Sequence, residues 1–145
     1  MNTDIIEKVL YEQTFEEAEA FLSSCDDSAV LHVFAYNHNW SDGFDLPRVV
    51  IDNPACSLST ALTVFYLADG YTYLTEKDEA EDIPEWQDFI TYLYQRILDG
   101  KFVERDIAFN LPLSKVQVFK LKKQLNEKEQ VFVTPIEGED LDLMI

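Results

Sequence analysis

The sequence predicts an all-α protein, a compact bundle of six or seven helices with at most one short extended segment near the C-terminus. Apolar residues recur at spacings of three and four along most of the chain. Helix-capping residues precede several of these stretches, and glycine or proline follows their ends. With 145 residues, of which 47% are hydrophobic, the chain can form one acidic helical domain over residues 1–145 with a sizeable core.

Three helices are expected in the first forty residues. The first follows Thr3. The second opens with Thr14 and Glu17, which have the spacing of a capping box. The third runs from Ser28, its expected cap, to about Tyr36, although the segment VLHVFAY also fits a strand. The residues expected to face inward are Ile5, Ile6, Val9 and Leu10 in the first helix, and Phe15, Ala18, Phe21 and Leu22 in the second.

The block from Asn39 to Leu74 predicts two further helices. Pro47 suits the first turn of a helix over Leu46 to Asp52, and Asn53-Pro54 ends it. Ser57 can cap the next helix, which is apolar on almost every side and is therefore expected in the centre of the core. Gly70 is expected to be the C-terminal cap of that helix.

The second half of the chain predicts one strongly amphipathic helix and one basic helix. Asp82 is the expected N-cap of the first, and Pro84 lies in its first turn. Ser114 and Gln117 open the last helix, which should end near Asn126. The tail that begins VFVTP can start with a short extended piece. The inner stripe of the amphipathic helix consists of Trp86, Phe89, Ile90, Leu93 and Ile97, with Gly100 at its end.

The sequence contains no strong catalytic, metal or cofactor motif. His32 and His38 are six residues apart, which is not the spacing of a helical ligand pair. Cys25 and Cys56 are too few for a disulfide scaffold and are expected to be reduced, packed thiols. Glycine-rich phosphate loops and nucleophile elbows are absent from the sequence. We therefore expect no catalytic residue, no metal, no cofactor and no enzymatic activity.

The formal net charge of −17 is the main compositional outlier. Such a charge repels phosphate backbones and anionic lipids, so direct binding to nucleic acid or membrane is not expected. The same charge accelerates encounter with a basic protein. The N-terminus MNTDIIEKVL lacks the pattern of a signal peptide, so a cytoplasmic location is expected.

The central block resembles a widespread bacterial family that is known only as a domain of unknown function. The resemblance rests on the motif NWxDG at residues 39–43 and on PxCxxxTALxxFYxADGYxYL at residues 54–74. The family implies no established activity. Its small acidic members are similar in size and charge to immunity proteins, which inhibit toxins in bacterial competition. By this analogy the resemblance implies a partner that is a basic toxin domain, often a nuclease. The chain after Leu74 carries no motif that we recognise.

The acidic run from Glu76 to Asp88 is the expected contact surface for that partner, since seven of its thirteen residues are acidic. A second acidic surface around Glu16 and Asp26 is the alternative. Two other functions remain open: a small ligand-binding or enzymatic domain that uses the Asn39–Asp42 turn, Asp69 and Tyr73, or a scaffold without a toxin partner. The expected contact residues are Glu76, Asp78, Glu79, Glu81, Asp82, Glu85, Tyr92 and Tyr94.

Overall fold

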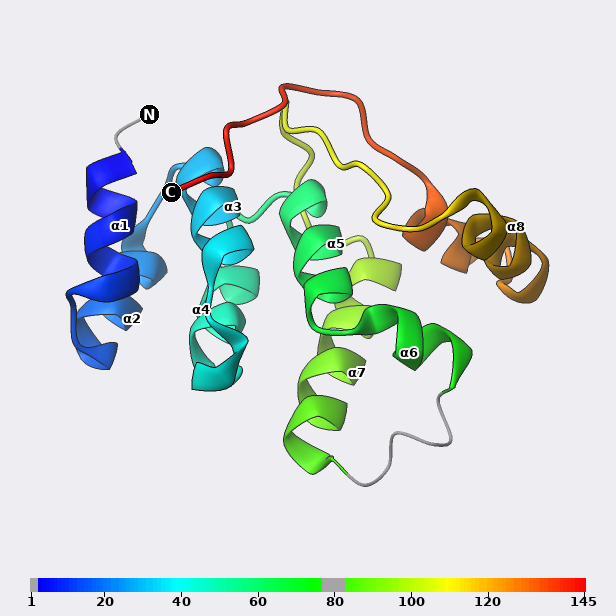
Figure 1. The fold of residues 1–145 in the computed structure, drawn as a ribbon, viewed down its shortest axis with the longest axis horizontal. Coiled ribbons are helices and arrows are strands. Elements are labelled where there is room, and N and C mark those ends of the chain that lie inside the picture. The colour runs from blue at the N-terminus through cyan, green and yellow to red at the C-terminus, as the bar shows by residue number, and fades with distance from the viewer. Residues whose placement is uncertain (1–2, 77–82) are drawn as a thin grey trace.

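The protein is all-α in a computed structural model that describes residues 3–76 and 83–145 (Figure 1). The helices are α1 Thr3–Tyr11, α2 Phe15–Ser24, α3 Ser28–Asn37, α4 Asp45–Asp52, α5 Leu58–Leu67, α6 Gly70–Thr75, α7 Pro84–Leu98 and α8 Lys115–Gln124, with 3-10 helices η1 Trp40–Asp42 and η3 Lys128–Val133. Helices α1 and α2 lie at one end of the molecule and α8 at the other, and α5 packs against both α3 and α7 (Figure 1).

The first two helices form as expected, but each turns one predicted core residue to solvent. Thr14 and Glu17 make the complete capping box at the start of α2. Ile5 and Phe15, both expected inside, are 44% and 43% exposed. Ile5 lies beside the buried stripe of α1, and Phe15 is the first residue of α2. The core is reached one or three residues later, at Ile6 and at Ala18.

Helix α3 settles the choice that its sequence left open between helix and strand. Its N-cap is Asp27 and not Ser28, because the Asp27 carboxylate accepts hydrogen bonds from the backbone amides of Ala29 and Val30. The Ser28 hydroxyl instead donates to the carbonyl oxygen of Ala55 at 2.6 Å. The carboxylate thus satisfies two of the backbone amides that are free at this helix end.

Helix α5 lies in the centre of the core and is capped by Ser57, as predicted. Gly70 is not its C-terminal cap, because Gly70 is the first residue of α6. The left-handed backbone conformation falls on Asp69, with φ of 64°. Gly70 serves a different purpose: a Cβ built there would lie 2.2 Å from the Phe65 ring. Glycine is needed here for close packing between α5 and α6.

The long helix α7 buries every residue of its predicted inner stripe, and Gly100 follows it with φ of 67°. The N-cap of α7 is Ile83 and not the expected Asp82. Asp82 itself lies outside the described residues. Ser114 and Gln117 form the second predicted capping box, at the start of α8.

The last predicted element is displaced along the tail. Val131–Val133, expected to be extended, belong to η3, which buries Phe132 and Val133 beneath α7. The extended pairing occurs later, where Ile136 bridges Phe109 and Glu139 bridges Ile107. The segment around residue 108 is thereby held against the tail. Together with α3, α5 and α8 it surrounds a surface cavity that is described below.

Candidate functional site

A cleft of about 400 Å³ separates the start of α4 from α7. The turn that precedes α4 determines the position of this cleft. His38 Nε2–H donates to the carbonyl oxygen of Gly43 at 2.9 Å, and Gly43 has φ of 95°. Burial lowers the pKa of His38, while the bond to Gly43 acts in the opposite direction. This turn brings Phe44 and Asp45 to face α7.

The floor of the cleft is aromatic. The rings of Phe44 and Phe89 have centroids 5.1 Å apart, and Trp40 packs on both rings at 5.9 and 6.2 Å. Ring contacts of this kind add about 0.5–1.5 kcal/mol each beyond the area they bury. The aromatic cluster therefore fixes the distance between η1, α4 and α7 and forms a firm floor.

The rim of the cleft is acidic. Among the described residues, its charged lining consists of Asp45 from α4, Glu85 and Asp88 from α7, and one cation, Arg48. The three carboxylates are on exposed residues. Glu85 and Asp88 are three residues apart on α7, so they lie on the same helical face. The cleft therefore combines an apolar floor with an excess of negative charge.

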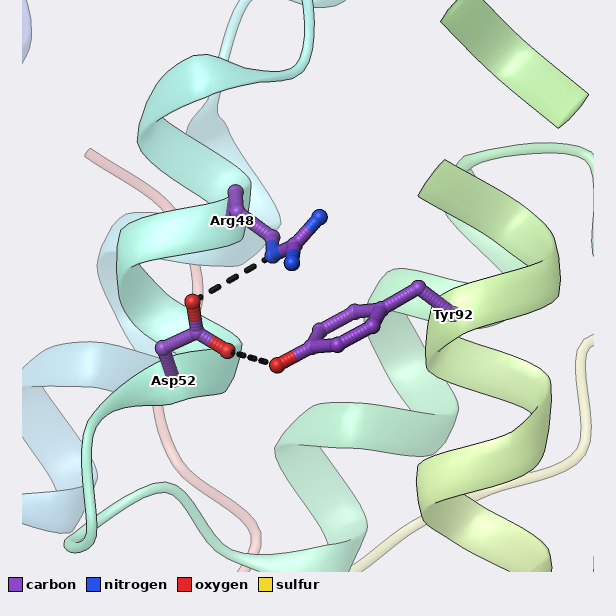
Figure 2. Close-up of polar contacts among 3 residues, drawn as sticks. All are labelled: Arg48, Asp52 and Tyr92. Atoms are coloured by element: carbon purple, nitrogen blue, oxygen red, sulfur yellow. Dashed lines mark hydrogen bonds and ion pairs between the residues drawn. The ribbon is translucent and has the colours of Figure 1, made fainter. Parts of the chain in front are cut away.

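The cation that the structure describes on this rim, Arg48, already has partners. Arg48 Nε donates to Asp52 Oδ2 at 3.2 Å, and its guanidinium carbon lies 3.4 Å from the centre of the Tyr92 ring (Figure 2). The Tyr92 hydroxyl donates to the other oxygen of Asp52 at 2.5 Å (Figure 2). The Asp52 carboxylate and the Tyr92 ring thus hold Arg48 from two sides. The positive charge of Arg48 is therefore already paired with the Asp52 carboxylate.

The structure separates the expected contact residues. Glu85 lines the cleft, and Tyr92 lies on the same side of α7. Tyr94 points to the other side, where its hydroxyl donates to Glu129 and its ring stacks on Phe132. Burial, and then the bond to Glu129, raises the pKa of Tyr94. Tyr92 and Tyr94 are two residues apart on a helix, which places them on opposite faces.

The remaining expected contacts lie before α7. Glu76 is exposed at the end of α6. The other four, Asp78, Glu79, Glu81 and Asp82, lie outside the described residues.

Sequence reasoning missed the contribution of α4 to this cleft. Asp45, Arg48 and Asp52 are spaced by three and four residues, as are Glu85, Asp88 and Tyr92. Each spacing indicates one charged helical face. No local signal shows that the two faces oppose each other, because their approach depends on Trp40, Phe44 and Phe89.

Residues of the alternative site around the Asn39–Asp42 turn have separate structural roles. Asn39 caps η1 by accepting from the amide and the hydroxyl of Ser41. Asp69 accepts from the Thr72 hydroxyl at 2.8 Å, at the junction of α5 and α6. Tyr73 is buried, and its ring packs against Phe65. These positions serve turns, a helix junction and the core.

Within residues 3–76 and 83–145, no group of three or more histidine, cysteine or acidic side chains is arranged to hold a metal ion. Across the same residues, every helix is too short or too polar to span a bilayer.

The fold and the cleft define a helical protein with an acidic, aromatic-floored groove on one side. The chain belongs to the family described as Domain of unknown function (DUF4274), whose model matches residues 26–98. That match contains the Asn39–Leu74 block and extends through α7, so it covers both walls of the cleft. No curated protein and no solved structure matches the chain.

Proposed function

We propose that this protein is a bacterial immunity protein, which binds a basic toxin domain and neutralises it by occluding the active site of the toxin. One observation carries the proposal: the cleft between α4 and α7 presents Asp45, Glu85 and Asp88 over an aromatic floor, while Arg48, the one cation among its described lining residues, is held by Asp52 and Tyr92. Such a groove fits a cationic side chain of a partner protein.

The chemistry favours arginine as that side chain. A guanidinium group can pair with carboxylates in a planar, bidentate geometry and can stack on an aromatic face. Phe44 and Phe89 supply the rings, and Glu85 and Asp88 supply carboxylates from one helical face. A nuclease uses basic side chains to bind phosphates, so carboxylates in this groove would occupy the place of the substrate phosphates.

The charge of the whole chain supports the same partner class. A net charge of −17 attracts a basic domain over distances comparable to the Debye length and disfavours competing nucleic acid. Glu76 adds an exposed carboxylate where α6 ends, on the chain that leads to α7. The proposed complex forms in the cytoplasm, where an immunity protein protects its own cell.

The decisive experiment pairs the protein with the C-terminal domain of a toxin encoded beside its gene. Co-expression should restore growth, and the two proteins should elute as one complex in size-exclusion chromatography. The variant Glu85→Gln/Asp88→Asn should weaken binding measured by calorimetry. Truncating one partner of a buried interfacial charge pair costs about 2–5 kcal/mol, and truncating a rim charge costs much less. The dependence of affinity on salt should also become shallower.

A matched control removes the same charge elsewhere. Glu104 and Asp106 are exposed and belong to neither the cleft lining nor the alternative acidic surface around Glu16 and Asp26, so Glu104→Gln/Asp106→Asn changes the net charge equally without touching either surface. This control should retain affinity and salt dependence. Equal losses in both variants would show that only overall charge matters. A toxin domain that neither binds nor is inhibited would refute the proposal.

A further inference from the structure

A second cavity, of about 570 Å³, lies apart from the acidic cleft. Its walls come from α3, α5, the start of α6, the segment from Ala108 to Leu113, the start of α8 and the tail at Leu143. Cavities of this size hold small organic molecules. None of the residues that line it also lines the acidic cleft.

The lining of this cavity is rich in rings and poor in charge. Tyr36, Tyr66, Tyr71 and Phe109 contribute aromatic side chains, and no lysine, arginine, aspartate or glutamate is among the described lining residues. In a chain of net charge −17, this is an unusual gap in the charge distribution. An anion would find no cation there and a cation no carboxylate, so the chemistry fits an uncharged ligand.

The walls of the cavity are firmly held. The Tyr66 and Phe109 rings are stacked, with an interplanar angle of 15° and centroids 6.1 Å apart. The Tyr66 hydroxyl donates to the carbonyl oxygen of Phe132, and Phe109 pairs with Ile136 through two backbone hydrogen bonds. Asn37 Nδ2 donates to the carbonyl oxygen of Leu143 at 2.7 Å, which fixes the tail on the rim. Preformed walls reduce the ordering entropy lost on binding.

His32 is the buried polar group of this cavity. It is 3% exposed, and burial lowers its pKa to about 4, so its imidazole is neutral at pH 7. Its Nδ1 lies 2.9 Å from Thr60 Oγ1, which in turn lies 2.9 Å from Ser57 Oγ. Among the described residues, Nε2 of His32 has no hydrogen-bond partner.

The hydrogen-bond chain fixes the tautomer. Ser57 is fully buried and its hydroxyl oxygen already accepts from the Thr60 amide at 3.0 Å. The Ser57 hydroxyl can donate only to Thr60 Oγ1 within this chain, so the Thr60 hydroxyl donates to His32 Nδ1. A neutral imidazole that accepts at Nδ1 carries its proton on Nε2. The opposite direction would leave the buried Ser57 hydroxyl without an acceptor, which is unfavourable.

We propose that this cavity binds an uncharged, flat or aliphatic small molecule that carries a hydrogen-bond acceptor, such as a carbonyl oxygen or a ring nitrogen. The His32 Nε2–H donates to that acceptor. The rings of Tyr36, Tyr66 and Phe109 contact the apolar part of the ligand. The site is separate from the proposed toxin-binding cleft, so this proposal does not depend on the proposed function.

Nile red is a suitable probe because it is uncharged, flat and carries a ring carbonyl. Titration into the protein should give saturable fluorescence with one site and a blue-shifted emission. Ala108→Phe places a large side chain in the lining and should weaken binding at least about tenfold. Phe119→Ser removes an exposed ring outside the cavity and should leave the affinity within about twofold.

A second measurement uses the unmodified protein and so does not depend on the folding of a variant. Long-range ¹H–¹⁵N spectra of His32 should show the Nε2–H tautomer, and Nile red should shift the Nε2 resonance as the fluorescence saturates. Unsaturable fluorescence, equal loss in Phe119→Ser and Ala108→Phe, or an Nε2 resonance unchanged at saturation would overturn the proposal.

Discussion

The Tyr92 hydroxyl donates a 2.5 Å hydrogen bond to an Asp52 carboxylate oxygen from a helix forty residues further along the chain. The same carboxylate accepts from Arg48, whose guanidinium covers the Tyr92 ring. The three side chains therefore join α4 to α7 at one end of the acidic cleft. They also pair Arg48, which lines the cleft, with Asp52, a carboxylate that is not among the described lining residues.

Removal of the Tyr92 hydroxyl should weaken this connection. Tyr92→Phe keeps the ring beneath Arg48 and deletes only the donor to Asp52. Hydrogen bonds to charged groups contribute about 1.5–3 kcal/mol, and the exposure of this pair reduces the expected loss to about 1 kcal/mol. Urea unfolding measures the change. Tyr11→Phe, at a 66% exposed position, is the control and should leave the unfolding free energy within about 0.5 kcal/mol.

A methyl group at Gly70 should be much more harmful than one at Gly100. The Cβ of Gly70→Ala would lie 2.2 Å from the Phe65 ring and 2.6 Å from the Phe65 carbonyl oxygen, so α6 must move. We expect a loss of about 3 kcal/mol or more in unfolding free energy. Gly100→Ala meets no atom within 4 Å and has only the strain of its φ of 67°, about 1 kcal/mol. Similar losses in both variants would contradict the close packing of α6 on α5.

Stability should decrease when the pH falls from about 6.5 towards 4, partly because of His32. Burial lowers the pKa of His32 from 6.5 to about 4, so in this range the unfolded chain binds a proton that the folded chain does not. The contribution of His32 to the unfolding free energy is complete above pH 6.5, the pKa of this imidazole in the unfolded chain. It is lost as the pH falls to about 4, the pKa of His32 in the folded protein. It is on the order of 3 kcal/mol.

The variant His32→Gln isolates this contribution from that of the many carboxylates. Glutamine can still accept from Thr60 but does not titrate, so its unfolding free energy should depend less steeply on pH in this range. Urea midpoints at several pH values measure both slopes. Parallel slopes would show that His32 can bind a proton in the folded protein.

The two thiols should differ sharply in reactivity. Burial raises the pKa of Cys56 to about 12, and the side chain is 1% exposed, so it should not react in the native state. Burial also raises the pKa of Cys25, but that thiol is half-buried and should react slowly. Thiol titration with a disulfide reagent should therefore find one reactive group per native chain and two after denaturation. Rapid modification of both native thiols would contradict the buried position of Cys56.

A carboxylate at Glu129 should hold η3 to α7. It is 7% exposed and accepts from the Tyr94 hydroxyl and from the Asn126 amide. Glu129→Ala leaves both donors without this acceptor, and we expect a loss of about 2–3 kcal/mol in unfolding free energy. Glu127→Ala, on an exposed neighbour, is the matched control. Equal effects of the two substitutions in urea unfolding would disprove this anchoring role.

The helices could be predicted because their signals are local. The capping boxes at Thr14 and Ser114, and the inner stripe of α7, depend on residues within one or two turns of each other. The predicted caps were wrong where two neighbouring residues could both serve as the cap of a helix. Asp27 replaced Ser28 as a cap, and Asp69 took the left-handed conformation that was expected of glycine.

The acidic cleft was only half predictable for a related reason. Glu85 and Tyr92 could be placed on one helix face from their spacing, but Tyr94 was expected to serve the same surface and faces Glu129 instead. The partner face on α4 lies forty residues earlier. Its approach depends on long-range contacts between Phe44 and Phe89, which no spacing along the chain encodes.

The sequence by itself determined that this protein is helical, strongly acidic and a carrier of the family motif within residues 26–98. Those properties depend on composition and on short-range periodicity. Tertiary structure alone decided which charges meet, since Asp45 joins Glu85 and Asp88 only after α4 packs on α7. It also decided that His32 lies buried at a cavity whose described lining contains no aspartate, glutamate, lysine or arginine, because that position depends on α5 and the tail converging on α3.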